Sequence, residues 1–136
     1  MSASDYDGSG VGVVIIDSGV TAWHDDLART VSNGRGPIGQ RVMSFVDLVD
    51  GASSAHDNFG HGTHVAGIIA GSGWDADGEY AGVAPGADLL VLRVLNAQGQ
   101  GTVSDVIRAL DYAMANRARF HLRVINLSIG AAVLES

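Results

Sequence analysis

Residues 11–16 read VGVVII and run directly into DSG at residues 17–19. The run is short, rich in β-branched side chains and apolar on both faces, a pattern typical of a strand buried within a parallel sheet. Residues 89–95 (LLVLRVL) and 122–127 (LRVINL) show the same pattern, and residues 42–49 give a weaker strand candidate. We therefore expect a parallel sheet.

Two helices are expected between these strands. Residues 61–70 combine apolar side chains with small ones, which favours a helix packed closely against another element. A second helix is expected after a cap at Ser104, because Val106, Ile107 and Leu110 follow at helical spacing. Strands that alternate with helices predict βαβ units, so the expected fold class is α/β.

The composition excludes several classes of protein. Of the 136 residues, 46% are hydrophobic and 17% are charged, so a disordered chain is excluded. The net charge of −7 argues against nucleic acid as a partner. No apolar run approaches the ~20 residues that cross a membrane. The absence of cysteine removes disulfides and thiolate chemistry, and the acidic residues 1–10 predict that no signal peptide is present.

Two polar residues stand where chemistry is expected in a parallel sheet, beyond the carboxyl ends of the strands. Asp17 follows the first strand, and His61 opens the first helix. An aspartate followed by a histidine tens of residues later is typical of nucleophilic acyl transfer, in which the carboxylate orients the imidazole base. Two simpler interpretations stay open, namely an aspartate that caps a helix and a histidine with a structural role.

Four short motifs carry a family resemblance. They are VVIIDSGV (13–20), HGTHVAG (61–67), GVAPGA (82–87) and VINLSIG (124–130). Their wording and order resemble the subtilisin-like serine proteases, or subtilases, over nearly the whole chain. The resemblance implies a doubly wound parallel α/β sheet. It also implies that residues 1–136 form the N-terminal portion of a catalytic domain whose C-terminal half is absent.

The resemblance assigns roles to individual residues. Asp17 and His61 match two members of the family's Asp-His-Ser triad. His64 is then expected to be structural and bonded inside the fold. Gly62 and Gly67 are expected to let the helix approach the sheet and the substrate cleft without bulky side chains. By the same resemblance we expect a secreted or extracytoplasmic protein.

The resemblance further implies a polypeptide substrate that lies as an extra strand between two segments of the enzyme. The matching segments are Gly99-Gln100-Gly101 and Ser128-Ile129-Gly130. Their glycines leave backbone N–H and C=O groups open to a peptide. The alternative interpretation is that these glycines only form turns.

The family's Gly-Thr-Ser motif, which holds the nucleophilic serine, does not occur in the sequence. In the family this serine and the asparagine of the oxyanion hole lie well downstream of the position of Ser128. Ser128 itself stands in NLSIG, which is similar to a nucleophile elbow, but such an elbow needs a helix directly after the serine. We therefore expect the chain alone to be inactive. The serine is expected from a complementing C-terminal segment or a second chain.

The sequence establishes no cofactor, and calcium is the one candidate that the resemblance suggests. Asp26 matches the place of an aspartate that ligates calcium in some subtilases. Asp75, Asp77 and Glu79 offer oxygen ligands at alternate positions of one loop. No complete EF-hand pattern is present, and a solvated acidic loop is the alternative.

Two other functions fit parts of the sequence. A metal hydrolase could use His61 and His64, since H-x-x-H places two imidazoles on one side of a helix, but no third ligand motif accompanies them. A non-catalytic half-domain could instead bind a peptide or a partner chain, because residues 124–127 are expected at an open sheet edge.

Overall fold

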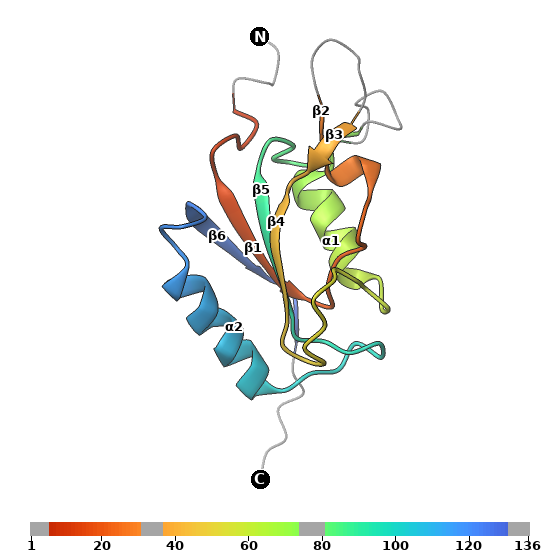
Figure 1. Cartoon of the computed structure of the whole chain (residues 1–136), viewed down its shortest axis with the longest axis vertical. Coiled ribbons are helices and arrows are strands. Elements are labelled where there is room, and N and C mark those ends of the chain that lie inside the picture. The colour runs from red at the N-terminus through yellow and green to blue at the C-terminus, as the bar shows by residue number, and fades with distance from the viewer. Residues whose placement is uncertain (1–5, 31–36, 74–80, 131–136) are drawn as a thin grey trace.

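The structure, a computed structural model of the chain, describes residues 6–30, 37–73 and 81–130 (Figure 1). Within these residues the main sheet has the strand order β4-β5-β1-β6. Its strands are β1 (Gly12–Asp17), β4 (Val42–Asp47), β5 (Asp88–Arg93) and β6 (Leu122–Leu127). Every pairing in this sheet is parallel, which confirms the predicted strands and the α/β fold class.

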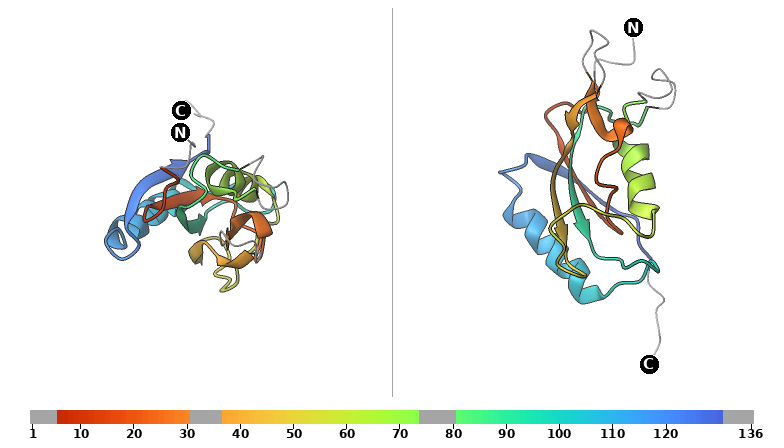
Figure 2. Two further views of the ribbon diagram at one scale, coloured as in Figure 1. Left: turned by 90° about the horizontal axis from the view of Figure 1, so that it is seen from above. Right: turned by 45° about the vertical axis from the view of Figure 1, so that its right-hand side comes forward.

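Two helices lie on opposite faces of the main sheet (Figure 2). They are α1 (His61–Ala70) and α2 (Val103–Ala115). Side chains alternate along β1, so Val13 and Ile15 pack into the core beneath α1, whereas Val14 and Ile16 pack beneath α2. The sheet is therefore doubly wound, as the sequence predicts.

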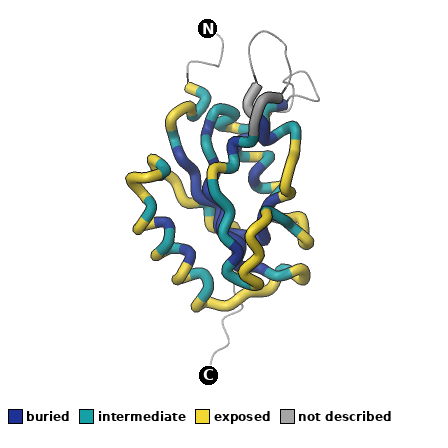
Figure 3. Tube along the Cα trace, viewed as in Figure 1, coloured by how far each residue is buried: buried dark blue, intermediate teal, exposed yellow. Residues whose placement is uncertain are grey.

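β1 and β5 form the centre of the core. Each has a paired strand on both sides and a helix over each face, so their apolar residues are buried (Figure 3). Burying one Val, Leu or Ile side chain contributes about 1.5–3 kcal/mol to folding. A strand that is buried on both faces therefore favours apolar residues at every position, and both strands read as nearly unbroken apolar runs.

β6 lies at one edge of the main sheet, beside β1. Val124, Ile125 and Leu127 are 50%, 41% and 44% exposed. No strand in the described part of the chain pairs with the outer side of β6, so the backbone groups of that side are open as well. The open edge that the sequence predicts is present within the described residues.

The helix boundaries test the predicted helices and cap. α1 spans the residues predicted for it. The expectation that Ser104 caps α2 is wrong, because the N-cap is Thr102, whose Oγ1 accepts a hydrogen bond from the Asp105 backbone N–H at 3.1 Å. Thr102 has the extended backbone of an N-cap, whereas Ser104 already lies in the first helical turn.

Three smaller elements were not predicted. A single 3-10 turn, η2 (Asp25–Leu27), leads into β2 (Ala28–Thr30), which pairs antiparallel with β3 (Pro37–Gln40).

Neither α1 nor α2 is long and apolar enough to cross a bilayer, and no other described helix is.

Arg41, between β3 and β4, joins three parts of the chain. Its Nη1 donates to Ala87 O at 2.9 Å, and its Nη2 donates to Asp26 O at 3.2 Å and to Ala70 O. Ala70 is the last residue of α1, where the helix dipole favours a positive charge. Arg41 is only 2% exposed, so water is poorly placed to replace it as a donor.

Replacing Arg41 with methionine should lower the free energy of unfolding by about 3 kcal/mol or more, because buried carbonyl groups would lose their donor. Urea unfolding of the chain measures the difference. Arg108→Met is the control, since the side chain of Arg108 is 61% exposed and pairs with Asp105 on the surface. Losing that pair should cost less than about 1 kcal/mol. Equal losses in the two variants would contradict the role given to Arg41.

Candidate active site

Asp17 and His61 meet at the carboxyl end of the main sheet. The side chain of Asp17, the last residue of β1, is fully buried, whereas that of His61, the first residue of α1, is 42% exposed. Asp17 Oδ1 and Oδ2 lie 2.8 and 2.9 Å from His61 Nδ1. A proton on Nδ1 satisfies the carboxylate, which leaves Nε2 as the nitrogen with a free lone pair. The structure therefore places the two predicted residues in bonding contact.

A close contact between two backbone segments sets this geometry. Gly62, the second residue of α1, packs against Gly19, and a Cβ at Gly62 would lie 2.2 Å from Gly19 O. Gly19 has a φ of +116°, and a Cβ there would lie 2.0 Å from His56 O. The close approach expected at Gly62 is confirmed. The same expectation is wrong for Gly67, where a Cβ would meet nothing within 4 Å in the described part of the chain.

Polar groups join the same two segments. Ser18 N donates to Asp17 Oδ1 at 2.7 Å, and Ser18 Oγ accepts from Gly62 N at 2.8 Å. Ser18 Oγ also donates to Asp57 Oδ1 at 2.8 Å. Burial alone would raise the pKa of Asp57, but hydrogen bonds from Thr63 and its other neighbours outweigh burial and lower that pKa. Asp57 is therefore an anion at neutral pH.

Asp57 is not among the residues predicted from the sequence, although a signal is present. An aspartate three residues before a glycine at a helix start is typical of a side chain that accepts backbone N–H groups. Asp57 Oδ1 accepts from Gly60 N at 2.8 Å, and Gly60, the N-cap of α1, makes no capping bond of its own. The carboxylate of Asp57 thus replaces a side-chain cap at α1.

A groove of about 460 Å³ lies between the segments that follow β5 and β6. It brings together Gly99, Gln100 and Gly101 from the first predicted binding segment with Ile129 and Gly130 from the second. Its apolar walls include the side chains of Leu95, Val103, Val106 and Leu127. The two segments predicted to hold a peptide therefore border one space.

Phe59 packs between Gly99, which lines the groove, and the imidazole of His61. Gly99 has a φ of +75°, and a Cβ there would come within 2.5 Å of the Phe59 ring. The centre of the same ring lies 6.4 Å from the centre of the His61 ring. Phe59 was not predicted as a site residue, because nothing in the local sequence indicates its contact with a loop some 40 residues away.

Comparisons with known proteins identify the family. The model of the Subtilase family matches residues 8–135. The chain belongs to the subtilase family.

Relatives of this subtilase chain are longer than the chain itself. Subtilisin DY of Bacillus licheniformis is 37% identical over 130 residues, which are 96% of this chain and 40% of that protein. Intracellular serine protease of Paenibacillus polymyxa is 36% identical over 124 residues, which are 90% of this chain and 34% of that protein. The crystal structure of a cold adapted subtilisin-like serine proteinase matches with a TM-score of 0.64 at 37% identity, and the match covers 82% of this chain and 34% of that one. The chain therefore spans no more than 40% of the length of these relatives.

Ser128 does not line the groove of this subtilase chain. Its Oγ accepts a hydrogen bond from Asn126 Nδ2 at 2.7 Å. Among the residues that the structure describes, no imidazole or carboxylate is bonded to this hydroxyl, so no base is placed to activate it as a nucleophile.

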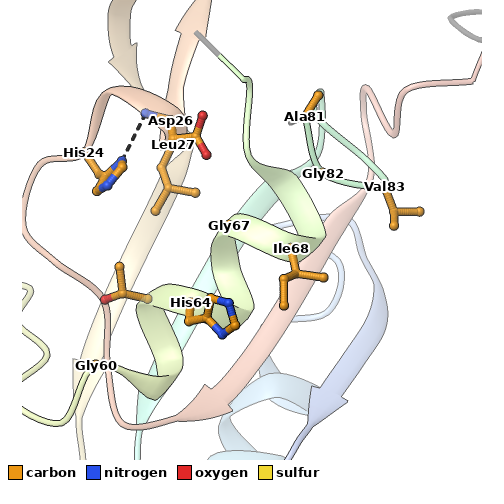
Figure 4. A pocket seen from close by; sticks show the side chains of 11 residues that line it. His24, Asp26, Leu27, Gly60, His64, Gly67, Ile68, Ala81, Gly82 and Val83 are labelled. Carbon is orange, nitrogen blue, oxygen red and sulfur yellow. Dashed lines mark hydrogen bonds between the residues drawn. The ribbon is translucent and has the colours of Figure 1, made fainter. Parts of the chain in front are cut away.

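His64 lies on the outer side of α1, in the wall of a second cavity of about 750 Å³ (Figure 4). His24 and Asp26 contribute to the same cavity. The expectation that His64 is bonded inside the fold is wrong for the described residues, since His64 is exposed and no hydrogen bond to its ring is found there. The cause is its position two residues after the buried Gly62, about 200° around the helix from the face that contacts the sheet.

Of the four calcium candidates, Asp26 is the one inside the described residues, and Asp75, Asp77 and Glu79 lie outside them. Asp26 Oδ1 accepts a hydrogen bond from Gly73 N at 2.8 Å. One oxygen of this carboxylate is therefore already used by the backbone, and Asp26 alone does not make a calcium site.

A different acidic cluster contains Asp47, Asp50 and His56, whose ligand atoms lie within 4.8 Å of one another. Arg93 Nη1 lies 2.9 Å from both Asp47 Oδ1 and Asp50 Oδ2. One guanidinium group thus already pairs with both carboxylates and offsets one of their two negative charges. These residues fit an ion pair better than they fit a metal ion.

Gly62→Ala should lower the free energy of unfolding by about 2 kcal/mol or more, because the added Cβ would collide with the backbone at Gly19. Gly67→Ala is the matched control in the same helix. It should be neutral or stabilise the chain by up to about 1 kcal/mol, since alanine favours helix and the site is open. Thermal unfolding of both variants measures this contrast, and a Gly62→Ala chain as stable as the parent would contradict the described contact.

Proposed function

We propose that this chain carries the aspartate–histidine pair of a subtilisin-like serine endopeptidase, which hydrolyses peptide bonds. The observation that carries the proposal is the contact of His61 Nδ1 with both oxygens of the buried Asp17 carboxylate, at 2.8 and 2.9 Å. Membership of the subtilase family supports it, as does the groove between the two predicted binding segments.

In this mechanism Asp17 holds His61 in the tautomer that leaves Nε2 unprotonated. Nε2 takes the proton from a serine hydroxyl while the serine oxygen attacks the carbonyl carbon of the substrate. The imidazolium then gives this proton to the leaving amine, and the buried carboxylate stabilises the positive charge in the interval. His61 is thus the general base and then the general acid, and Asp17 orients it.

The nucleophilic serine is proposed to come from outside the 136 residues. They contain no Gly-Thr-Ser sequence, and the chain spans only 40% of subtilisin DY. Ser128 has no base bonded to it within the described residues. A complementing C-terminal segment or a second chain would supply the serine and the oxyanion-hole donor, and the chain alone would be inactive.

The polypeptide substrate is proposed to bind in the groove between the loop at Gly99-Gln100-Gly101 and the segment Ser128-Ile129-Gly130. A bound peptide would form main-chain hydrogen bonds as an added strand. The loop supports this, since Gly99 lines the groove and packs against Phe59, whose ring centre lies 6.4 Å from that of His61.

A second candidate is a non-catalytic half-domain that binds a partner chain. The unpaired outer edge of β6 favours it, because such an edge is a template for strand addition, and the exposed apolar side chains of this strand would add to the contact.

A secreted or extracytoplasmic location stays a prediction. One relative at 36% identity carries the name Intracellular serine protease, so family membership alone assigns no compartment.

A chimera tests the proposed function. Residues 8–135 would replace the matched segment of subtilisin DY, which is 37% identical to the chain over 130 residues. The chimera should hydrolyse a chromogenic peptide, and His61→Ala should lower its kcat/KM by about 10⁴-fold or more, because the general base is lost. Asp17→Asn should lower it by about 10⁴-fold, since the amide favours the wrong tautomer.

His64→Ala in the chimera is the control, because this histidine lies on the same helix but away from Asp17. It should keep kcat/KM within about tenfold of the parent. The isolated 136-residue chain should show neither turnover nor serine labelling by a fluorophosphonate. Labelling above background, or equal losses for the two histidine variants, would refute the proposed roles.

A further inference from the structure

The carboxylate of Asp57 accepts four hydrogen bonds at the start of α1. Oδ1 accepts from Ser18 Oγ and from Gly60 N, each at 2.8 Å. Oδ2 accepts from Thr63 N at 2.8 Å and from Thr63 Oγ1 at 2.6 Å. Two of the donors are backbone groups of the helix start, where the helix dipole favours an anion. Four accepted hydrogen bonds are many for one carboxylate. Asp57 nevertheless contacts neither Asp17 nor His61 directly.

The two hydroxyl groups that donate to Asp57 are also the bridges between α1 and the segment after β1. Ser18 Oγ accepts from Gly62 N at 2.8 Å, and Thr63 Oγ1 accepts from Thr21 N at 3.0 Å. Each hydroxyl has one proton. Because Asp57 takes both protons, the oxygen lone pairs are left to accept from the two backbone N–H groups. Asp57 thus fixes the direction of both bridges.

These bridges directly follow the catalytic pair in both segments. Ser18 follows Asp17 in sequence, and its N–H donates to Asp17 Oδ1 at 2.7 Å. Gly62 and Thr63 directly follow His61 in α1. A shift of either bridge would therefore move the carboxylate relative to the imidazole.

We infer that Asp57 is a positioning residue for the proposed reaction, acting through Ser18 and Thr63 to fix the geometry between Asp17 and His61. The inference rests on the proposed function, because Asp57 can position the pair for the reaction only if Asp17 is the orienting acid and His61 is the base. Asp57 touches neither reacting atom, so its contribution is the direction of the Nδ1–H bond to Asp17.

Asp57→Asn is the test, because the substitution keeps the shape and removes half of the acceptors. The NH₂ group of the asparagine cannot accept hydrogen bonds. In one orientation of the amide this group would face the donors of Thr63, and in the other orientation it would face those of Ser18 and Gly60. The readout is proton NMR of the His61 Nδ1–H signal in the full 136-residue chain. We expect exchange of this proton with water to become at least about tenfold faster than in the parent.

Asp47→Asn is the matched control. Asp47 also accepts several backbone N–H groups, from Val49, Asp50 and Ala52, and it is bonded to Arg93. Its loss should destabilise the chain while leaving the His61 exchange rate within about twofold of the parent. Equal acceleration in both variants would overturn the inference, because it would reduce the effect of Asp57 to general loss of stability.

Ser18→Ala provides a second variant in case Asp57→Asn does not fold. It removes one bridge, so the exchange of the His61 proton should again become faster than in the parent. An unchanged rate in Ser18→Ala, or in a folded Asp57→Asn chain, would overturn the inference.

Asp17→Asn separates this inference from the proposed function. If it abolishes the His61 Nδ1–H signal, the orienting contact exists, and the Asp57 and Ser18 variants then decide the inference alone. If the His61 Nδ1–H signal is the same in Asp17→Asn as in the parent chain, the proposed function fails, and the positioning role of Asp57 fails with it.

Discussion

The contact between the backbones of Gly19 and Gly62 is the constraint on which the site depends. It leaves no room for a Cβ at Gly62, and it holds the first turn of α1 against the segment that follows β1. At Gly19 it is His56 O that leaves no room for a Cβ. At this separation a short aspartate side chain at the strand end reaches the ring of a histidine at the helix start. A wider gap would leave a buried carboxylate without its partner, which is costly in a protein interior. The two glycines and the bonded pair of Asp17 and His61 are therefore one structural unit.

The parallel sheet explains why the remaining features gather near this unit. The ends of β4, β5 and β1 lie in register, so that Asp47, Arg93 and Asp17 form a row across three strands. Arg93 is bonded to Asp47 and Asp50, and this ion pair occupies one end of the row. Asp17, at the other end, is bonded to His61. The loops after β5 and β6 leave the sheet at the same end as Asp17, and the groove lies between these loops.

The parts of the fold that could be predicted are those with a local pattern. β1 and β5 are buried on both faces, and this environment requires the apolar runs that the sequence shows. The pairing of Asp17 with His61 was predicted from their positions at a strand end and a helix start, together with the motifs around them. The strand pattern lies within a few neighbouring residues, whereas Asp17 and His61 are 44 positions apart and their pairing was predicted only because two motifs resemble those of a known family.

The parts that could not be predicted depend on contacts between distant residues. Asp57 meets Ser18 across 39 positions of the sequence, and no periodicity marks that distance. The bonding of His64 depends on what covers the outer side of α1, which the helical pattern does not indicate. The cap of α2 was misplaced because Thr102 and Ser104 both have suitable side chains, and only the backbone conformation distinguishes them.

¹⁵N NMR of the His61 ring in the 136-residue chain, under conditions where the ring is neutral, measures directly whether Asp17 orients the imidazole. The two ring nitrogens have different ¹⁵N shifts according to which of them bears the proton. We expect the proton on Nδ1, facing Asp17, and an Nε2 with the shift of an unprotonated nitrogen. A ring that bears its proton mainly on Nε2 would refute the orienting role of Asp17, because the buried carboxylate would then have no donor from His61.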